Sequence, residues 1–207
     1  MACLGEKIFT NQLTVKTIAI AIAIGIWLAF PGTGVAQNKT CIDNVPPARL
    51  LNRPLNNPPP EDRHAILDLI HSYAWTLEGR DYAAFIALFT NDAVYEVCRN
   101  GGGAQSQIVR TTSQKELEDY IRGQFADLEA DELQTRHFLT NTILNTDDKV
   151  VQAKTAMLVI VQQADDAIPE VDYTAVLKMR IVKVDDIWKF EKLTLFTDTP
   201  EFIAKAR

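Results

Sequence analysis

The stretch IHSYAWTLEGRDYAAFIALFTNDAVYE, residues 70–96, decides the fold of this 207-residue chain. Its first part continues an apolar face that starts upstream and recurs at helical spacing, at Ile66, Leu69, Ile70, Tyr73 and Leu77. Acidic residues at 61–62 suit the positive end of that helix, and Gly79 predicts its end. A second, short helix is expected over 82–89, and a strand begins within NDAVYEV at 91–97.

The remainder of the chain predicts one more helix followed by strands. Residues 113–129 form a helical pattern in which Ser113 and Glu116 have capping-box spacing, after a loop at 98–107. Alternating runs at 136–144, 149–163, 171–184 and 188–197 then predict strands, two of them long enough to be bent or bulged. Helices followed by an antiparallel meander indicate an α+β fold, with a strongly curved sheet around the long first helix and a pocket inside.

The N-terminal region differs in composition from the rest of the chain. Lys7 and Lys16 precede the apolar run 17–30, and the small residues Gly34 and Ala36 follow it. This order is typical of a secretory signal peptide over residues 1–36, and the apolar run is shorter than the roughly 20 residues that span a bilayer. We therefore expect an exported protein, periplasmic or secreted, that leaves the membrane after cleavage. An uncleaved membrane anchor is the alternative.

Residues 37–60 hold six of the nine prolines and predict an extended leader without a core of its own. The domain is expected over 61–199, with a short tail at 200–207. Once a signal peptide is removed, Cys41 and Cys98 remain, and a pair of cysteines in an exported protein indicates a possible disulfide. Two separate thiols are the alternative.

Charge and motif content exclude several functions. The net charge is −6 and the chain has no cluster of Lys and Arg, so we expect no nucleic-acid partner and no attraction to anionic lipid. The sequence has no Cys or His spacing typical of zinc and no phosphate-binding or serine-nucleophile motif, so we expect no metal and no cofactor.

Two motifs give the chain a family resemblance. The helix with its following run D-x-x-x-F-x-x-L-F-x-x-D-A, from Asp81 to Ala93, and RHFLTN at 136–141 resemble the SnoaL-like branch of the nuclear-transport-factor-2-like superfamily. The similarity runs from about Glu61 to Thr197. It implies a cone-shaped α+β barrel, a homodimer and an internal pocket for a small hydrophobic molecule. Members include scytalone dehydratase, ketosteroid isomerase, polyketide cyclases and proteins that only bind a ligand.

The dehydratase-like members of this family imply site residues in this chain. They use a tyrosine on the first helix, an acid five positions later and a histidine at the start of the strand after the third helix. Those positions are Tyr73, Glu78 and His137 here. The chain departs from the pattern in having Glu at the acid position. It also has no match for a second aspartate later in the sheet, where residues 157–161 are wholly apolar.

His137 is the central candidate. On a regular strand, His137 and Asn141 would share one face with the apolar residues 139 and 143, and a buried polar pair needs partners such as a polar ligand. Asn141 is therefore a candidate substrate-binding residue. The alternative for His137 is a core histidine bonded to a neighbouring carbonyl, and the alternative for Tyr73 is an aromatic core residue.

These observations favour one function and leave another open. The first is a cofactor-independent dehydratase or isomerase that acts on a small cyclic or polyketide-like compound. In it, His137 would be the base, Tyr73 the acid or oxyanion partner, and Glu78 the carboxylate that orients His137 and favours its protonated form. The second is a non-catalytic binding or dimerisation module of the same fold.

Overall fold

The computed structural model describes residues 56–99, 106–147, 149–164 and 168–198. The predicted signal peptide at 1–36, nearly all of the leader at 37–60 and the tail at 200–207 lie outside these ranges, so their assignments stay predictions. Within the described ranges, no helix combines the length and apolar character needed to cross a membrane.

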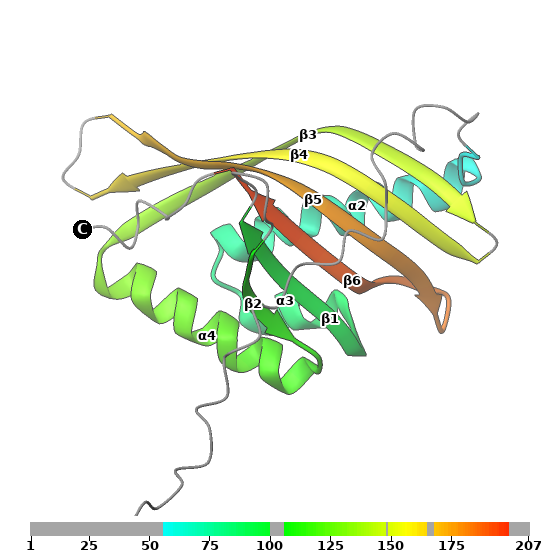
Figure 1. Ribbon diagram of the computed structural model, residues 1–207, viewed down its shortest axis with the longest axis horizontal. Helices are drawn as coiled ribbons and strands as arrows, with labels where there is room; N and C mark the ends of the chain where they lie inside the picture. Colours follow the sequence, from blue (N-terminus) through cyan, green and yellow to red (C-terminus); the bar gives the residue numbers. More distant parts are fainter. Residues whose placement is uncertain (1–55, 100–105, 148, 165–167, 199–207) are drawn as a thin grey trace, which may run out of the picture. The chain divides into compact units, whose positions relative to one another are not determined.

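Six strands form one sheet in the described residues, in the order β2-β1-β6-β5-β4-β3 (Figure 1). They are β1 (Phe89–Arg99), β2 (Ser106–Thr111), β3 (Leu133–Asp147), β4 (Val150–Gln163), β5 (Glu170–Val184) and β6 (Ile187–Thr197). All neighbours are antiparallel except β1 and β6, which are parallel. The α+β class and the mostly antiparallel sheet are confirmed, and the sheet is curved but open, with β2 and β3 as its edges.

The loop predicted at 98–107 is shorter than expected. Cys98 and Arg99 still belong to β1, and Ser106 already belongs to β2, which pairs antiparallel with β1. The polar residues of this segment gave no apolar alternation, because a strand at the edge of a sheet need not bury one full face.

Three helices pack against the sheet: α2 (Pro60–Glu78), α3 (Tyr82–Ala87) and α4 (Gln114–Ala130). The helix α2 begins at Pro60, where a missing N–H costs nothing, and ends before Gly79, as predicted. At α4, the Ser113 side chain accepts from the N–H of Glu116, and the Glu116 carboxylate accepts from the N–H of Thr112. The capping box is confirmed, although its glutamate reaches one residue further back than usual.

The core lies between these helices and the inner face of the sheet. Figure 1 shows β3, β4 and β5 bending over α2, with α4 below them beside β1 and β2. The helices contribute Ile66, Leu69, Ile70 and Tyr73 from α2 and Leu117, Ile121 and Phe125 from α4, all buried. On the sheet side, alternate residues of β4 from Val151 to Val161 are buried. The predicted apolar face of the first helix is therefore the face that covers the sheet.

The register shifts in every strand pairing of the described sheet, and two of these bulges, in β3 and β5, change which residues face inward. In β3, residues 141 and 142 together oppose Thr155 of β4. In β5, Asp172 is the extra residue between two consecutive pairs of the β4–β5 register, since Tyr173 lies opposite Val159 and Val171 lies opposite Ile160. Each bulge adds one residue to its strand and redirects the side chains beside it.

Candidate functional site

A cavity of about 110 Å³ lies between α2, α4 and the inner face of the sheet. Side chains from α2, α4 and the sheet form its wall, and most of them are apolar or aromatic. The lining residues are Tyr73, Leu77, Tyr95, Val97, Tyr120, Ile121, Gln124, Phe125, Leu128, Thr135, His137, Val159, Asp172, Tyr173 and Leu195. Tyr73 and His137, predicted as partners, therefore line the same cavity.

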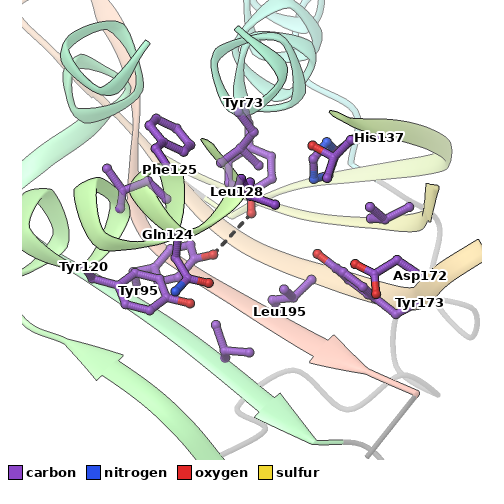
Figure 2. Close-up of a pocket in the computed structure, with 15 residues that line it drawn as sticks. Tyr73, Tyr95, Tyr120, Gln124, Phe125, Leu128, His137, Asp172, Tyr173 and Leu195 are labelled. Atoms are coloured by element: carbon purple, nitrogen blue, oxygen red, sulfur yellow. Dashed lines mark hydrogen bonds between the residues drawn. The ribbon is translucent and has the colours of Figure 1, made fainter. Parts of the chain in front are cut away.

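Tyr73 projects from the buried face of α2 into this cavity and is 2 % exposed. Its hydroxyl lies 3.4 Å from the hydroxyl of Tyr95 on β1, a long hydrogen bond that either group can donate. Figure 2 shows these two hydroxyls pointing toward each other. The Tyr73 ring also packs against Phe85 and Phe190, so the core fixes where its hydroxyl lies.

Four tyrosines meet at this cavity: Tyr73, Tyr95, Tyr120 and Tyr173. Burial raises the pKa of every one of them, to about 12 for Tyr120. Repulsion between neighbouring phenolates raises the pKa of Tyr73, Tyr95 and Tyr173 further. All four hydroxyls therefore stay protonated at neutral pH, and each can donate a hydrogen bond to a ligand oxygen.

His137 faces the cavity from β3, opposite Val159 of β4. Its side chain is 8 % exposed, and burial lowers the pKa of the imidazole from 6.5 to about 4. The ring is thus neutral at physiological pH. Its Nδ1 is buried and has no hydrogen-bond partner among the described residues. A buried polar atom of this kind costs free energy unless a ligand or water satisfies it.

Glu78, at the end of α2, lies beside His137 but outside the cavity lining. Its Oε1 accepts the backbone N–H of His137 at 2.7 Å, whereas the ring Nδ1 is 3.9 Å away, beyond hydrogen-bond distance. The Arg136 guanidinium lies 3.4 Å from its other oxygen. Glu78 therefore holds the strand at His137 and does not bond the ring. The expectation that it keeps the ring protonated is wrong, because burial dominates and lowers the pKa of His137.

The structure does not bring Asn141 to the cavity. The bulge in β3 gives Asn141 a left-handed backbone with φ of 57° and leaves its side chain exposed. Thr142 takes the inner position, where its hydroxyl lies 2.8 Å from that of Thr155. The prediction that His137 and Asn141 share one face is wrong, because the extra residue shifts the alternation between them.

Asp172 is the cavity residue that the sequence analysis missed. It is 5 % exposed and lines the cavity from the start of β5, beside Tyr173 (Figure 2). Simple alternation along β5 places Asp172 on the outer face, since Tyr173, Ala175 and Leu177 point inward. The bulge turns both Asp172 and Tyr173 inward. No pattern in the sequence of β5 alone reveals this, because a bulge is defined by the pairing with β4.

Two other predicted features concern cysteine and metal. Cys98 is buried in β1 and disulfide-bonded, but Cys41 lies outside the described residues, so their pairing stays a prediction. Within the described part of the chain, no group of three or more His, Cys, Asp or Glu side chains is arranged to hold a metal ion.

The chain belongs to the SnoaL-like domain family, whose model matches residues 60–194. A comparison with curated protein sequences gives no significant match. The family assignment agrees with the helix-and-strand motif from which the resemblance was inferred.

Solved structures of the same fold confirm the architecture. ActVI-ORFA from Streptomyces coelicolor matches with a TM-score of 0.57 and 18 % identity over 67 % of this chain and 98 % of that one. A proposed scytalone dehydratase from Novosphingobium aromaticivorans matches with a TM-score of 0.55 and 18 % identity over 67 % and 85 %. The β subunit of a proposed aromatic-ring-hydroxylating dioxygenase from the same organism matches with a TM-score of 0.59 and 17 % identity over 68 % and 92 %. At these identities the likeness establishes the fold alone.

Proposed function

We propose that this protein is a cofactor-independent dehydratase or isomerase acting on a small cyclic hydroxycarbonyl compound in the cavity. The observation that carries the proposal is that His137, a neutral imidazole whose buried Nδ1 has no partner among the described residues, lines a cavity that Tyr73 also lines. A neutral imidazole in a cavity wall can act as a proton acceptor. One of the structural neighbours is a proposed scytalone dehydratase, which is consistent with this chemistry.

In the proposed dehydration, His137 removes a proton from the carbon next to the ligand carbonyl. The electron pair of that C–H bond forms the C=C bond, and the bond from the next carbon to its hydroxyl breaks. The imidazolium then returns the proton to the departing hydroxide, so that water and an unsaturated carbonyl compound leave. The imidazolium forms with the Glu78 carboxylate 3.9 Å from Nδ1, which stabilises its positive charge.

Tyr73 has the role of a hydrogen-bond donor to the carbonyl oxygen in this proposal. Burial and neighbouring phenols raise its pKa, so it holds its proton and stabilises the negative charge that develops on oxygen without transferring it. Tyr95, bonded to Tyr73, fixes the direction of that hydroxyl. Of the two roles predicted for Tyr73, the oxyanion partner is therefore favoured over the acid.

The test is turnover of monocyclic β-hydroxyketones without added cofactor, followed through the absorbance of the enone that forms. We expect His137→Gln, which keeps a polar side chain of similar size, to lower the rate by about 10²- to 10⁴-fold. Exposed His71→Gln on α2 is the matched control and should leave the rate unchanged. Binding of these compounds with no turnover would support the alternative, a binding protein of the same fold.

Export and assembly are part of the same proposal. We propose that the domain is exported after cleavage near Ala36, pairs Cys41 with Cys98 and forms a homodimer. The disulfide-bonded state of Cys98 supports the second point. Mass spectrometry of the protein purified from its native host, with and without reduction, measures the N-terminus and the pairing, and light scattering measures the assembly. An intact N-terminus would favour the anchored alternative.

A further inference from the structure

Asp172 lines the cavity because of a bulge in β5. It is the extra residue of the β5 bulge, and the neighbouring positions show how the bulge acts: Val171 is 54 % exposed on the outer face, while Asp172 is 5 % exposed on the inner one. A carboxyl group is costly to bury, and this one lies beside Tyr173 in the wall of the cavity. Bulges commonly redirect a side chain toward a site.

The described residues that line the cavity include the carboxylate of Asp172 and no Lys or Arg. Glu78, just behind His137, is paired with Arg136 and adds little to that charge. The charge of Asp172 is felt locally, because it raises the pKa of Tyr173. A carboxylate or phosphate on a ligand would meet a like charge at Asp172, with no cation among the described lining residues to offset it.

The hydrogen-bonding groups are divided between donors and acceptors. The bonded hydroxyls of Tyr73 and Tyr95 leave one O–H to donate on one side of the cavity, and Asp172 and the neutral His137 offer acceptors on another (Figure 2). A carboxylate has about four acceptor positions, so Asp172 can take a ligand hydroxyl in addition to its protein contacts. The cavity, at about 110 Å³, is smaller than the roughly 150 Å³ of cavities that hold one benzene molecule, so it limits a ligand to a single ring.

We propose that Asp172 determines ligand specificity, by accepting a hydrogen bond from a hydroxyl of an uncharged single-ring ligand and by excluding ligands that carry a carboxylate or phosphate. This inference rests on the proposed function, because it concerns the same cavity. The inference specifies two properties of the substrate that the proposed function leaves open, its charge and its hydrogen-bonding groups. It assigns a role to a residue on β5, whereas the second aspartate that the family resemblance implied would have lain near residues 157–161.

The test compares two probes of the same ring size, resorcinol and 3-hydroxybenzoate, which differ in carrying a hydroxyl or a carboxylate. Their dissociation constants are measured by NMR titration, with the His137 ring signals reporting occupancy of the cavity. Asp172→Asn keeps the shape of the side chain and removes its charge. Asp172→Ser also removes the charge, with a smaller side chain, and replaces the first variant if that variant folds poorly. Asp119→Asn, an equal charge change on the exposed side of α4, is the control.

We expect the wild-type protein to bind resorcinol at least roughly tenfold more tightly than 3-hydroxybenzoate. Asp172→Asn should bring the two constants within about threefold, and Asp119→Asn should keep the wild-type ratio. Equal binding of both probes by the wild type, or a ratio unchanged by Asp172→Asn, would overturn the role of Asp172 alone. If neither probe binds or moves the His137 signals, the cavity is not a ligand site and the proposed function fails with it.

Discussion

Two bulges of the sheet, in β3 and in β5, have opposite consequences for the cavity. In β3 the extra residue, Asn141, is turned out to solvent with a left-handed backbone, and Thr142 takes the inner position. In β5 the extra residue, Asp172, is turned in and buried at the cavity wall. One predicted polar residue is thereby lost from the cavity, and an unpredicted one is gained. The polar groups of the site depend on where strand pairing slips as well as on strand alternation.

The largest expected difference between the buried part of β3, at His137, and its exposed bulge, at Asn141, is in how stability responds to acid. The folded protein holds the pKa of His137 near 4, below its unfolded value of 6.5. Above pH 6.5 the ring is neutral in both states. Between pH 6.5 and 4 the unfolded state takes up a proton that the folded state resists, so stability falls as the pH falls, by about 3 kcal/mol at and below pH 4. Urea unfolding of wild type and His137→Gln between pH 7 and 4 measures this difference, which Asn141→Gln should not change.

Removing the Glu78 carboxylate tests how the strand is held beside the cavity. Glu78→Ala leaves the backbone N–H of His137 without its partner, at an expected cost of about 1–3 kcal/mol in the free energy of unfolding. Glu129→Ala, at an exposed carboxylate, should change it by less than about 0.5 kcal/mol. Equal effects of the two variants in urea unfolding would show that Glu78 does not anchor β3.

These two predictions concern features that the sequence revealed to different degrees. The apolar spacing from Ile66 to Leu77 predicted α2 and its inward face, and the same face carries Tyr73 to the cavity. His137 was predicted on the correct face because it precedes the β3 bulge. Asn141 was misplaced and Asp172 was missed, because a bulge is set by hydrogen bonding to the neighbouring strand, which leaves no signal in local alternation. The atom of His137 that Glu78 contacts was likewise not predictable, because it depends on how the end of α2 meets β3.

Tyr73→Phe removes a hydroxyl from the donor side of the cavity. The variant loses the 3.4 Å contact with Tyr95, and we expect a loss of about 0.5–1.5 kcal/mol in stability, because both hydroxyls are buried. Tyr82→Phe, at a tyrosine that is 38 % exposed, is the control with an identical chemical change. Thermal unfolding of the two variants under the same conditions measures the difference between their stability losses. Equal losses would show that the Tyr73 hydroxyl adds nothing beyond the aromatic ring.

The β3 bulge itself provides the smallest expected effect. Glycine adopts the φ of 57° at Asn141 without steric cost, but it adds entropy to the unfolded chain. Asn141→Gly should therefore change the free energy of unfolding by no more than about 0.5 kcal/mol and should leave ligand affinity unchanged. A marked loss of affinity in calorimetric titration would show that Asn141 belongs to the binding site, which contradicts the geometry of the bulge.

The central claim, that His137 is a neutral, buried acceptor in a cavity shared with Tyr73, is tested most directly by NMR titration of the His137 ring nitrogens. His64 and His71, both exposed on α2, help assign the spectrum through their own substitution. The structure predicts a His137 pKa near 4, with ring signals that move when Tyr73 is replaced by Phe. A His137 that titrates at the ordinary value of 6.5 and ignores the Tyr73 change would contradict the claim.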